Sequence, residues 1–184
     1  SLQDFLRRHL NTHKDLLNLP DAAAIQLNDT HPSIAVAELM RLLVDQHEIP
    51  WEKAWELTVG TLAYTNHTLL PEALETWPVA LMERMLPRHM QIIYLINAYH
   101  IDSLRAKGLH DFDVLRAVSL IEEDNGRRVR MGNLAFLGSH SVNGVSALHS
   151  KLMKSTVFSE LHKLYPQRIN NKTCLLYTSP SPRD

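Results

Sequence analysis

The sequence predicts a helix-rich α/β domain, and three observations support this fold class. Apolar residues recur at helical spacing through most of the 184 residues. A short apolar run at residues 22–27 instead has the length and weak alternation of a buried strand. The hydrophobic content of 45% and the charged content of 21% are those of an ordinary globular protein with one substantial core.

The first part of the chain is expected to carry this strand between helices. Leu2, Phe5 and Leu6 have helical spacing at the start of the sequence. Pro32 suits the first turn of a helix, because its missing N–H would be unpaired there anyway. We expect the core-facing side of that helix to consist of Val36, Leu39, Met40 and Leu43.

Three further helices are predicted in the middle of the chain. The second of these covers residues 71–86 and is bent or offset by Pro78. The third, at 88–107, is apolar on nearly all sides, which indicates a helix buried on most sides. The first runs from 51 to 64 and is expected to bury Trp51, Trp55, Val59 and Leu62.

The last third of the sequence is expected to hold shorter elements. Asp111 or Asp113 can cap a short helix that runs through Leu120. Residues 129–136 are interpreted as short β structure. A loop at 138–144 is then expected to lead into a helix with an apolar side formed by Val145, Leu148 and Leu152.

Composition argues against several classes of partner and location. A net charge of −1 gives no electrostatic reason to expect nucleic acid or an anionic membrane. No apolar run approaches the roughly 18–20 residues of a membrane span, and no charged-then-apolar leader opens the sequence. The single cysteine excludes an internal disulfide and a Cys-rich zinc site. A reducing, cytoplasmic setting is therefore expected.

The first of two unusually polar segments follows the predicted strand. Asn28, Asp29, Thr30 and His31 bring short polar side chains to its carboxyl end. Ligands in open α/β sheets bind outside the carboxyl ends of strands, so this segment is a candidate binding site. The alternative is structural, with Asp29 or Thr30 capping the next helix and His31 packed nearby.

The second polar segment follows a predicted helix. Asn66, His67 and Thr68 would line a pocket for a hydroxyl-rich ligand. In the alternative, His67 is a partly buried imidazole with satisfied hydrogen bonds, and Glu72 and Glu75 only complement a helix dipole. Residue spacing does not separate these two interpretations.

The eleven histidines raise the question of a metal site. The sequence has no H-E-x-x-H motif, and His140 and His149 lie nine residues apart on different predicted elements. It also lacks G-x-S-x-G, and the loop at 138–144 lacks G-x-G-x-x-G spacing. A metal-dependent hydrolase is therefore not favoured, and no bound metal is expected.

Residue identity adds a family resemblance. N-G-R-R-V-R-M at 125–131 is similar to bacterial members of the glycogen/maltodextrin (α-glucan) phosphorylases. The motifs that resemble the family as a whole are Q-L-N-D-T-H-P at 26–32, Y-T-N-H-T-L-L-P-E-A-L-E-T-W-P at 64–78, L-P-R-H-M-Q-I-I-Y at 86–94 and S-H-S-V-N-G-V-S-A-L-H-S at 139–150.

The resemblance implies how the chain is organised. Residues 1–173 would form part of the N-terminal, Rossmann-like domain of a two-domain (GT-B type) glycosyltransferase, as an internal fragment of a much longer enzyme. Residues 174–184 are unlike the family and have the Ser/Pro/Arg composition of an unrelated disordered tail. Cys174 stands where the family has a sugar-contacting asparagine.

The resemblance also implies a reaction and its site. The family cleaves a terminal α-1,4-linked glucose with inorganic phosphate to give glucose 1-phosphate, assisted by pyridoxal 5′-phosphate. His67 would be the catalytic residue, with its main-chain carbonyl facing the developing oxocarbenium charge and its imidazole bonding the primary hydroxyl of the sugar. Asp29 and Thr68 would line the sugar cavity, and Val145 would form an apolar wall.

The resemblance places several required groups outside this chain. The cofactor lysine and the phosphate-binding residues belong to the family's C-terminal domain, so the isolated chain is expected to be inactive. Dimerisation is usual in the family, and a homodimer is expected of the full-length protein. A mostly helical, non-catalytic interaction module whose polar segments are structural caps is the alternative function.

Overall fold

The computed structural model describes residues 1–70, 74–124 and 126–173. The start of the helix predicted at 71–86, with Glu72, lies outside the described residues. The predicted tail at 174–184 lies outside them as well, together with its Cys174 and the turn residue Asn125.

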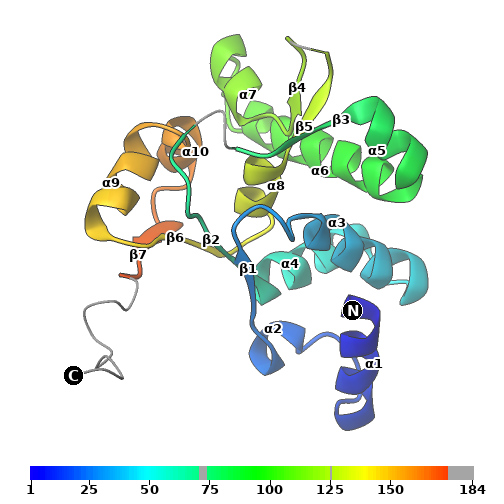
Figure 1. Ribbon diagram of the computed structural model, residues 1–184. Coiled ribbons are helices and arrows are strands. Elements are labelled where there is room, and N and C mark those ends of the chain that lie inside the picture. The colour runs from blue at the N-terminus through cyan, green and yellow to red at the C-terminus, as the bar shows by residue number, and fades with distance from the viewer. Residues whose placement is uncertain (71–73, 125, 174–184) are drawn as a thin grey trace, which may run out of the picture.

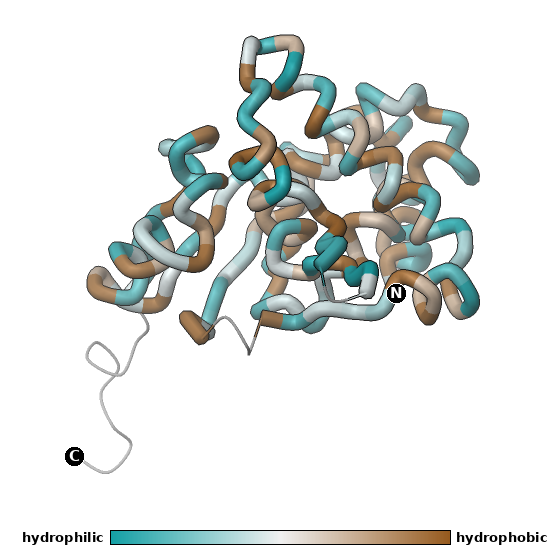
Figure 2. Tube along the Cα trace, turned by 90° about the horizontal axis from the view of Figure 1, so that it is seen from above, coloured by the Kyte–Doolittle hydropathy of each residue, from teal (hydrophilic) through white to brown (hydrophobic). Residues whose placement is uncertain are grey.

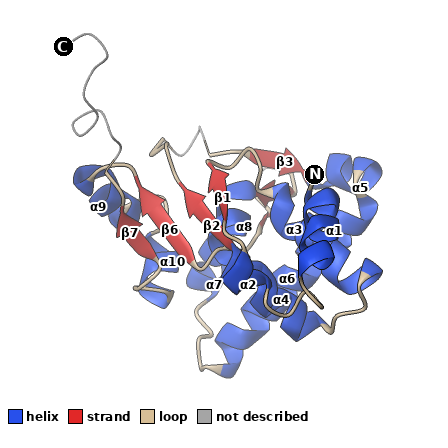
Figure 3. Cartoon of the chain, turned by 90° about the horizontal axis from the view of Figure 1, so that it is seen from below, coloured by secondary structure: helices blue, strands red, loops and turns tan. Residues whose placement is uncertain are grey.

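A four-stranded parallel sheet organises the chain (Figures 1 and 3). Its strands occur in the order β1-β2-β6-β7, which confirms the α/β class. Because all four run in one direction, their carboxyl ends share one edge of the sheet. The strands are β1 (Ile25–Asn28), β2 (Leu62–Thr65), β6 (Ser141–Gly144) and β7 (Ile169–Asn171).

The register of the sheet separates an apolar face from a polar one. Leu27, Tyr64, Val142 and Ile169 pair in one row across the four strands, and each is at most 4% exposed. The neighbouring row runs through polar side chains on the other face, where the Thr65 hydroxyl donates to the Asn143 amide oxygen over 2.8 Å.

Helices pack against the sheet, and a small antiparallel sheet lies beyond it next to α5 and α6 (Figure 1). That sheet has the order β3-β5-β4, with β3 at Thr76–Pro78, β5 at Arg128–Arg130 and β4 at Ile121–Glu122. The helical elements are α1 (Leu2–Thr12), α2 (Leu19–Ala22), α3 (Ile34–Arg41), the π-helix η1 (Leu42–Gln46), α4 (Trp51–Thr61), α5 (Val79–Met85), α6 (Pro87–Ala106), α7 (Phe112–Val118), α8 (Met131–Leu137), α9 (Ala147–Ser155) and α10 (Ser159–Leu164).

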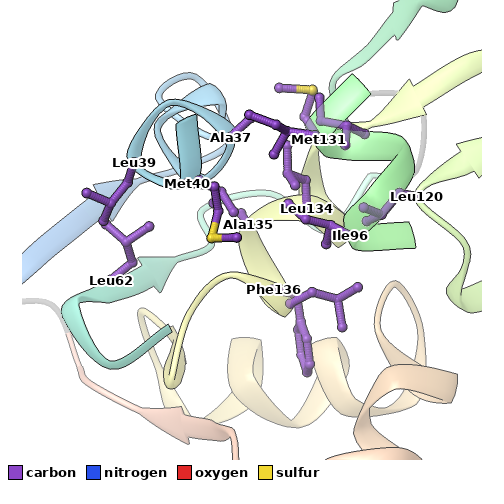
Figure 4. Close-up of a cluster of buried hydrophobic side chains, with 14 of the residues drawn as sticks. Ala37, Leu39, Met40, Leu62, Ile96, Leu120, Met131, Leu134, Ala135 and Phe136 are labelled. Atoms are coloured by element: carbon purple, nitrogen blue, oxygen red, sulfur yellow. The ribbon is translucent and has the colours of Figure 1, made fainter. Parts of the chain in front are cut away.

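The core is built around α8, all seven residues of which are buried. Figure 4 shows Leu134 and Ala135 of this helix among Met40 of α3 and Ile96 of α6. Close packing of α8 against α3 continues at Gly138, where a Cβ atom would lie 2.5 Å from a methyl carbon of Val36. The absence of a side chain at Gly138 therefore allows the two helices to approach.

Several predicted elements are confirmed. The helix at the start of the chain is α1, the strand is β1, and the long helix is α6. The predicted burial of α6 on most sides was wrong, because Leu95 is 47% exposed and Tyr99 is 44% exposed. The predicted core face of the helix after Pro32 is fully buried. Asp111 is the cap of α7, because its carboxylate accepts from the backbone N–H groups of Asp113 and Val114.

The helix predicted at 51–64 was wrong at its end and in its buried face. Helix α4 ends at Thr61, and residues 62–65 form the central strand β2 instead. Pairing with strands on both sides outweighs the helical spacing of Leu62, which is fully buried in the sheet. The buried side of the helix consists of Ala54, Leu57, Thr58 and Thr61 rather than the tryptophans.

The prediction for 71–86 was wrong over Thr76–Pro78, which pairs with β5 as strand β3. The helix α5 begins only after Pro78, since proline suits a helix start better than a helix interior. The β structure predicted for 129–136 is present only through Arg130, and the apolar run that follows is the buried helix α8. A short run that is apolar on every side fits both structures, so spacing could not decide.

Two predictions near the C-terminal end of the described chain were also wrong. The loop predicted at 138–144 contains strand β6, in which Val142 and Gly144 face the core. The side of α9 predicted to be buried is open: Leu148 is 67% exposed and Leu152 is 37% exposed. The helix turns Ser150 and Met153 inward instead, because these meet Gly144 in β6.

Hydrophobic and hydrophilic residues are interspersed along the chain, as Figure 2 shows. Within the part of the chain that the structure describes, no helix has the length and hydropathy needed to cross a membrane.

Replacing Gly138 with alanine should destabilise the protein by about 1–3 kcal/mol, because the new Cβ would overlap the buried side chain of Val36. Gly132→Ala is the matched control, since its Cβ would lie 3.6 Å from the nearest atom, an ordinary contact. Urea unfolding of both variants checks this prediction. Equal midpoints for the two variants would contradict it.

Stability should also decrease in acid because of His100 in α6, which is 5% exposed. Burial lowers the pKa of His100 to about 4, below the 6.5 of a free imidazole. The unfolded chain therefore binds the extra proton first, so this contribution is complete above pH 6.5 and is lost as the pH falls towards 4. Urea unfolding at several pH values should show that the free energy of unfolding decreases less in acid for His100→Gln than for the wild-type protein, by up to ~3 kcal/mol. Identical pH profiles would refute the assignment.

Candidate functional site

The four residues that the sequence singled out lie at the carboxyl edge of the parallel sheet. Asp29 follows β1, His67 and Thr68 follow β2, and Val145 follows β6. These strands are direct neighbours in the sheet, so the fold gathers segments that are more than 100 residues apart in sequence. Ligands of open α/β sheets bind at this edge.

Asp29 connects the segments that follow β1 and β2. Its backbone N–H donates to the Thr65 carbonyl over 2.9 Å, which extends the pairing of the two strands by one residue. One carboxylate oxygen accepts the backbone N–H of Thr30 at 2.6 Å, and the other accepts that of His67 at 2.9 Å. Asp29 thus fixes the position at which the chain enters His67.

The backbone of Asp29 is left-handed, with φ of 62°. Aspartate tolerates this conformation better than most residues because its short side chain bonds locally to the backbone. The structural alternative, in which Asp29 or Thr30 caps the following helix, does not describe this site. The N-cap of α3 is Ser33, and it makes no side-chain capping bond.

A second contact next to the site joins Thr30 and Glu75. Thr30 is 1% exposed, and its hydroxyl donates to one oxygen of Glu75 over 2.9 Å. The other oxygen accepts the indole N–H of Trp77 at 2.6 Å. Glu75 therefore acts as a structural acceptor rather than as a partner of a helix dipole. His31 was expected to pack nearby, but its side chain is 82% exposed and only approaches Glu75 to 3.8 Å.

His67 lies in an exposed segment outside helix and strand. Its N–H is bound by Asp29. Among the described residues, no backbone N–H donates to its carbonyl. Thr68 is half-buried beside it, with its hydroxyl accepting the Leu70 N–H at 3.4 Å. A carbonyl on a fixed backbone is a dipole that can be aimed at a ligand.

Asn66 was expected to line a ligand pocket with His67 and Thr68, and this prediction was wrong, because its side chain is buried and bonded within the protein. Asn66 is fully buried, and its backbone N–H donates to the Asn143 carbonyl over 3.0 Å. Its side-chain nitrogen donates to the Tyr64 hydroxyl at 3.0 Å, and its side-chain oxygen accepts from Nε2 of His149 at 3.0 Å. Interpreting 62–65 as a strand would have revealed this, because Asn66 then faces the same side as Tyr64.

Burial sets the protonation of the groups around Asn66. It raises the pKa of the Tyr64 phenol, so this hydroxyl stays neutral. It also lowers the pKa of His149, on α9, which favours a neutral imidazole. The buried side of the site is therefore an uncharged hydrogen-bonded chain, whereas Asp29 supplies a carboxylate on the other side of His67.

Val145 is half-buried directly after β6, where the Gly144 carbonyl accepts the N–H of Lys172 at 3.0 Å. A separate cavity of about 220 Å³ is lined by His31, Glu75 and several apolar side chains. Neither Asp29 nor His67 is among its lining residues. The candidate site is thus an open edge rather than this cavity.

The chemistry of the edge does not match a metal or a Schiff base. Over the described residues, no group of three His, Cys, Asp or Glu side chains could hold a metal ion. The polar side chains that meet around Asp29, Asn66 and His149 are carboxylate, amide, hydroxyl and imidazole groups. None of these four groups forms a Schiff base, which requires a lysine amine.

Comparison with known proteins identifies relatives along nearly the whole chain. The chain is 52% identical over 181 residues to the liver form of glycogen phosphorylase from Bos taurus, which covers 94% of this chain and 21% of that protein. It is 52% identical over 173 residues to glycogen phosphorylase from Synechocystis sp., covering 94% of this chain and 20% of that protein. It is 51% identical over 173 residues to glycogen phosphorylase from Haemophilus influenzae, covering 94% of this chain and 21% of that protein.

The chain thus spans about a fifth of the length of these curated relatives. Mammalian and bacterial proteins are similar to it to the same degree, so a bacterial-type sequence stays a prediction. The family model of the carbohydrate phosphorylases matches residues 1–176. The chain therefore belongs to the carbohydrate phosphorylase family.

Proposed function

We propose that this chain is a segment of an α-1,4-glucan phosphorylase, which cleaves a terminal glucose with inorganic phosphate to give glucose 1-phosphate. The observation that carries this proposal is the hydrogen bond from the His67 backbone N–H to the Asp29 carboxylate. The relatives named glycogen phosphorylase support the same reaction. The assay is release of glucose 1-phosphate from maltodextrin by a full-length protein that contains this segment.

The geometry of His67 suits a glycosyl transition state. When the bond to the departing sugar breaks, positive charge develops near the anomeric carbon. A carbonyl oxygen carries partial negative charge, and it stabilises such a cation best when it is already in place. The N–H of His67 is held by Asp29, so its carbonyl can be presented without reorganisation of the preceding backbone.

The neighbouring side chains complete the proposed sugar site. The exposed imidazole of His67 bonds the primary hydroxyl of the sugar, and Thr68 and Val145 contribute a polar and an apolar wall. Both carboxylate oxygens of Asp29 already accept backbone N–H groups. Asp29 therefore serves mainly to hold His67, while its remaining lone pairs stay available to a sugar hydroxyl or to water.

We assign residues 1–173 to the N-terminal Rossmann-like part of a two-domain, GT-B type enzyme. The parallel sheet with helices around it, and a candidate site at its carboxyl edge, support this assignment. The second domain would face that edge and complete the cleft. Residues 174–184 remain predicted to be an unrelated tail.

Pyridoxal 5′-phosphate, expected from the family, would supply its phosphate group to the reaction. Carboxylate, amide, hydroxyl and imidazole groups meet around Asp29, Asn66 and His149, and none of these forms its Schiff base. The cofactor lysine is expected in the second domain. A glucan and inorganic phosphate are the proposed substrates of a cytoplasmic homodimer.

The alternative of a helical interaction module has no specific support. It requires the polar segments to be helix caps. Asp29 instead joins two neighbouring segments at the edge of the sheet, and Asn66 is buried between β2 and α9.

In the full-length protein, Asp29→Ala should lower kcat by about tenfold to a hundredfold, because the backbone of His67 loses its anchor. Asp29→Asn should lower it less, since asparagine keeps one oxygen acceptor and tolerates the left-handed backbone. Steady-state phosphorolysis measures both variants, and Asp21→Asn, at an exposed aspartate outside the site, is the control. Wild-type kcat in Asp29→Ala would contradict this role.

His67→Ala in the same protein should lower kcat more than it weakens glucan binding. The variant keeps a main-chain carbonyl but loses the imidazole, whose contact is proposed to strengthen in the transition state. Steady-state kinetics with a parallel measurement of glucan affinity separates the two effects. An unchanged kcat would contradict a catalytic role for the His67 imidazole.

A further inference from the structure

We infer that Asn66 and His149 are positioning residues for the His67 carbonyl, an assignment that rests on the proposed function. His149 lies on α9, more than 80 residues from His67 in sequence, and acts through Asn66. Together they hold the chain entering His67 from the side opposite Asp29.

Every hydrogen-bonding group of Asn66, apart from its carbonyl, has a defined partner. The backbone N–H is bound by the Asn143 carbonyl of β6. The side chain joins the Tyr64 hydroxyl to the His149 ring, at 3.0 Å on each side. Asn66 is fully buried, so water does not reach its polar groups. Each group that loses its partner would therefore be left unpaired, at a cost of about 1–3 kcal/mol.

These contacts determine where the backbone enters residue 67. Asn66 is fixed by β6 and α9, and the following N–H is fixed by the Asp29 carboxylate after β1. Three separate parts of the fold therefore define the position of the His67 Cα atom. The carbonyl carbon of His67 is bonded directly to that Cα atom. A shift at Asn66 therefore displaces the proposed catalytic dipole.

The approach of His149 is built into the turn between β6 and α9. Ser146 is the N-cap of α9, and its hydroxyl oxygen accepts the backbone N–H of His149 at 3.1 Å. His149 therefore lies in the first turn of the helix. At Gly144 a Cβ atom would lie 2.8 Å from Cδ2 of His149 and 2.5 Å from the hydroxyl oxygen of Ser150. Glycine at this position therefore lets α9 approach close enough for the ring to contact Asn66.

The pattern of donors specifies one tautomer of His149. Asn66 uses its nitrogen as a donor to Tyr64, so its oxygen requires a donor, and this donor is the Nε2–H of His149. Protonation would keep that hydrogen bond but would add positive charge near His67. The partially buried, neutral ring fits a position next to a centre that becomes cationic, and the titratable groups near it are the His67 imidazole and the Asp29 carboxylate.

The test compares three substitutions of His149 in the full-length protein, with maltodextrin and inorganic phosphate as substrates. His149→Ala should lower kcat by about tenfold or more and change KM by less than about twofold. His149→Gln should recover most of kcat, because its amide nitrogen occupies the place of Nε2. His149→Asn should resemble His149→Ala, since its shorter amide cannot reach Asn66.

Lys151→Ala, at an exposed position of the same helix, is the matched control and should keep wild-type kinetics. Thermal unfolding of all variants separates loss of fold from loss of position. A wild-type kcat for His149→Ala, or equal kcat values for the Gln and Asn variants, would overturn the inference and leave the proposed function intact. A folded wild-type protein that releases no glucose 1-phosphate would instead overturn the proposed function, and the inference with it.

Discussion

Parallel pairing of β1, β2 and β6 is the constraint on which the other features of the site depend. Leu27, Tyr64 and Val142 lie in one buried row, so the alternation of each strand leaves little freedom of register. A shift by one residue would move the apolar side chains of that strand to the polar face of the sheet. The same register places the segments after the three strands side by side, although they are far apart in sequence.

The site combines a charged anchor with an uncharged one. The Asp29 carboxylate accepts two backbone N–H groups at the half-exposed side, where its charge remains partly hydrated. On the buried side, Tyr64, Asn66 and His149 form a neutral chain of hydrogen bonds. Burying a charge there would be costly, whereas a fully paired polar network is tolerated and makes the local structure rigid.

Much of this could be predicted from sequence, and the failures have a common cause. The long helix α6 and the Asp111 cap depend on local patterns, as does the strand before Asp29, and local patterns are visible in one sequence. The segment 62–65 fits both a helix end and a strand, and only its pairing with distant strands decides. Asp29 and His67 were assigned through the family resemblance. The buried role of Asn66 and its contact with His149 were not foreseen, because that contact spans 83 residues.

The left-handed backbone of Asp29 has a consequence for sequence variation at this position. Glycine, asparagine and aspartate are the residues that adopt this conformation most easily. Of these three, only aspartate offers two equivalent oxygen atoms to two N–H donors. Almost no substitution therefore preserves both the backbone conformation and the two acceptor oxygens. Position 29 should tolerate fewer amino acids than other half-exposed surface positions.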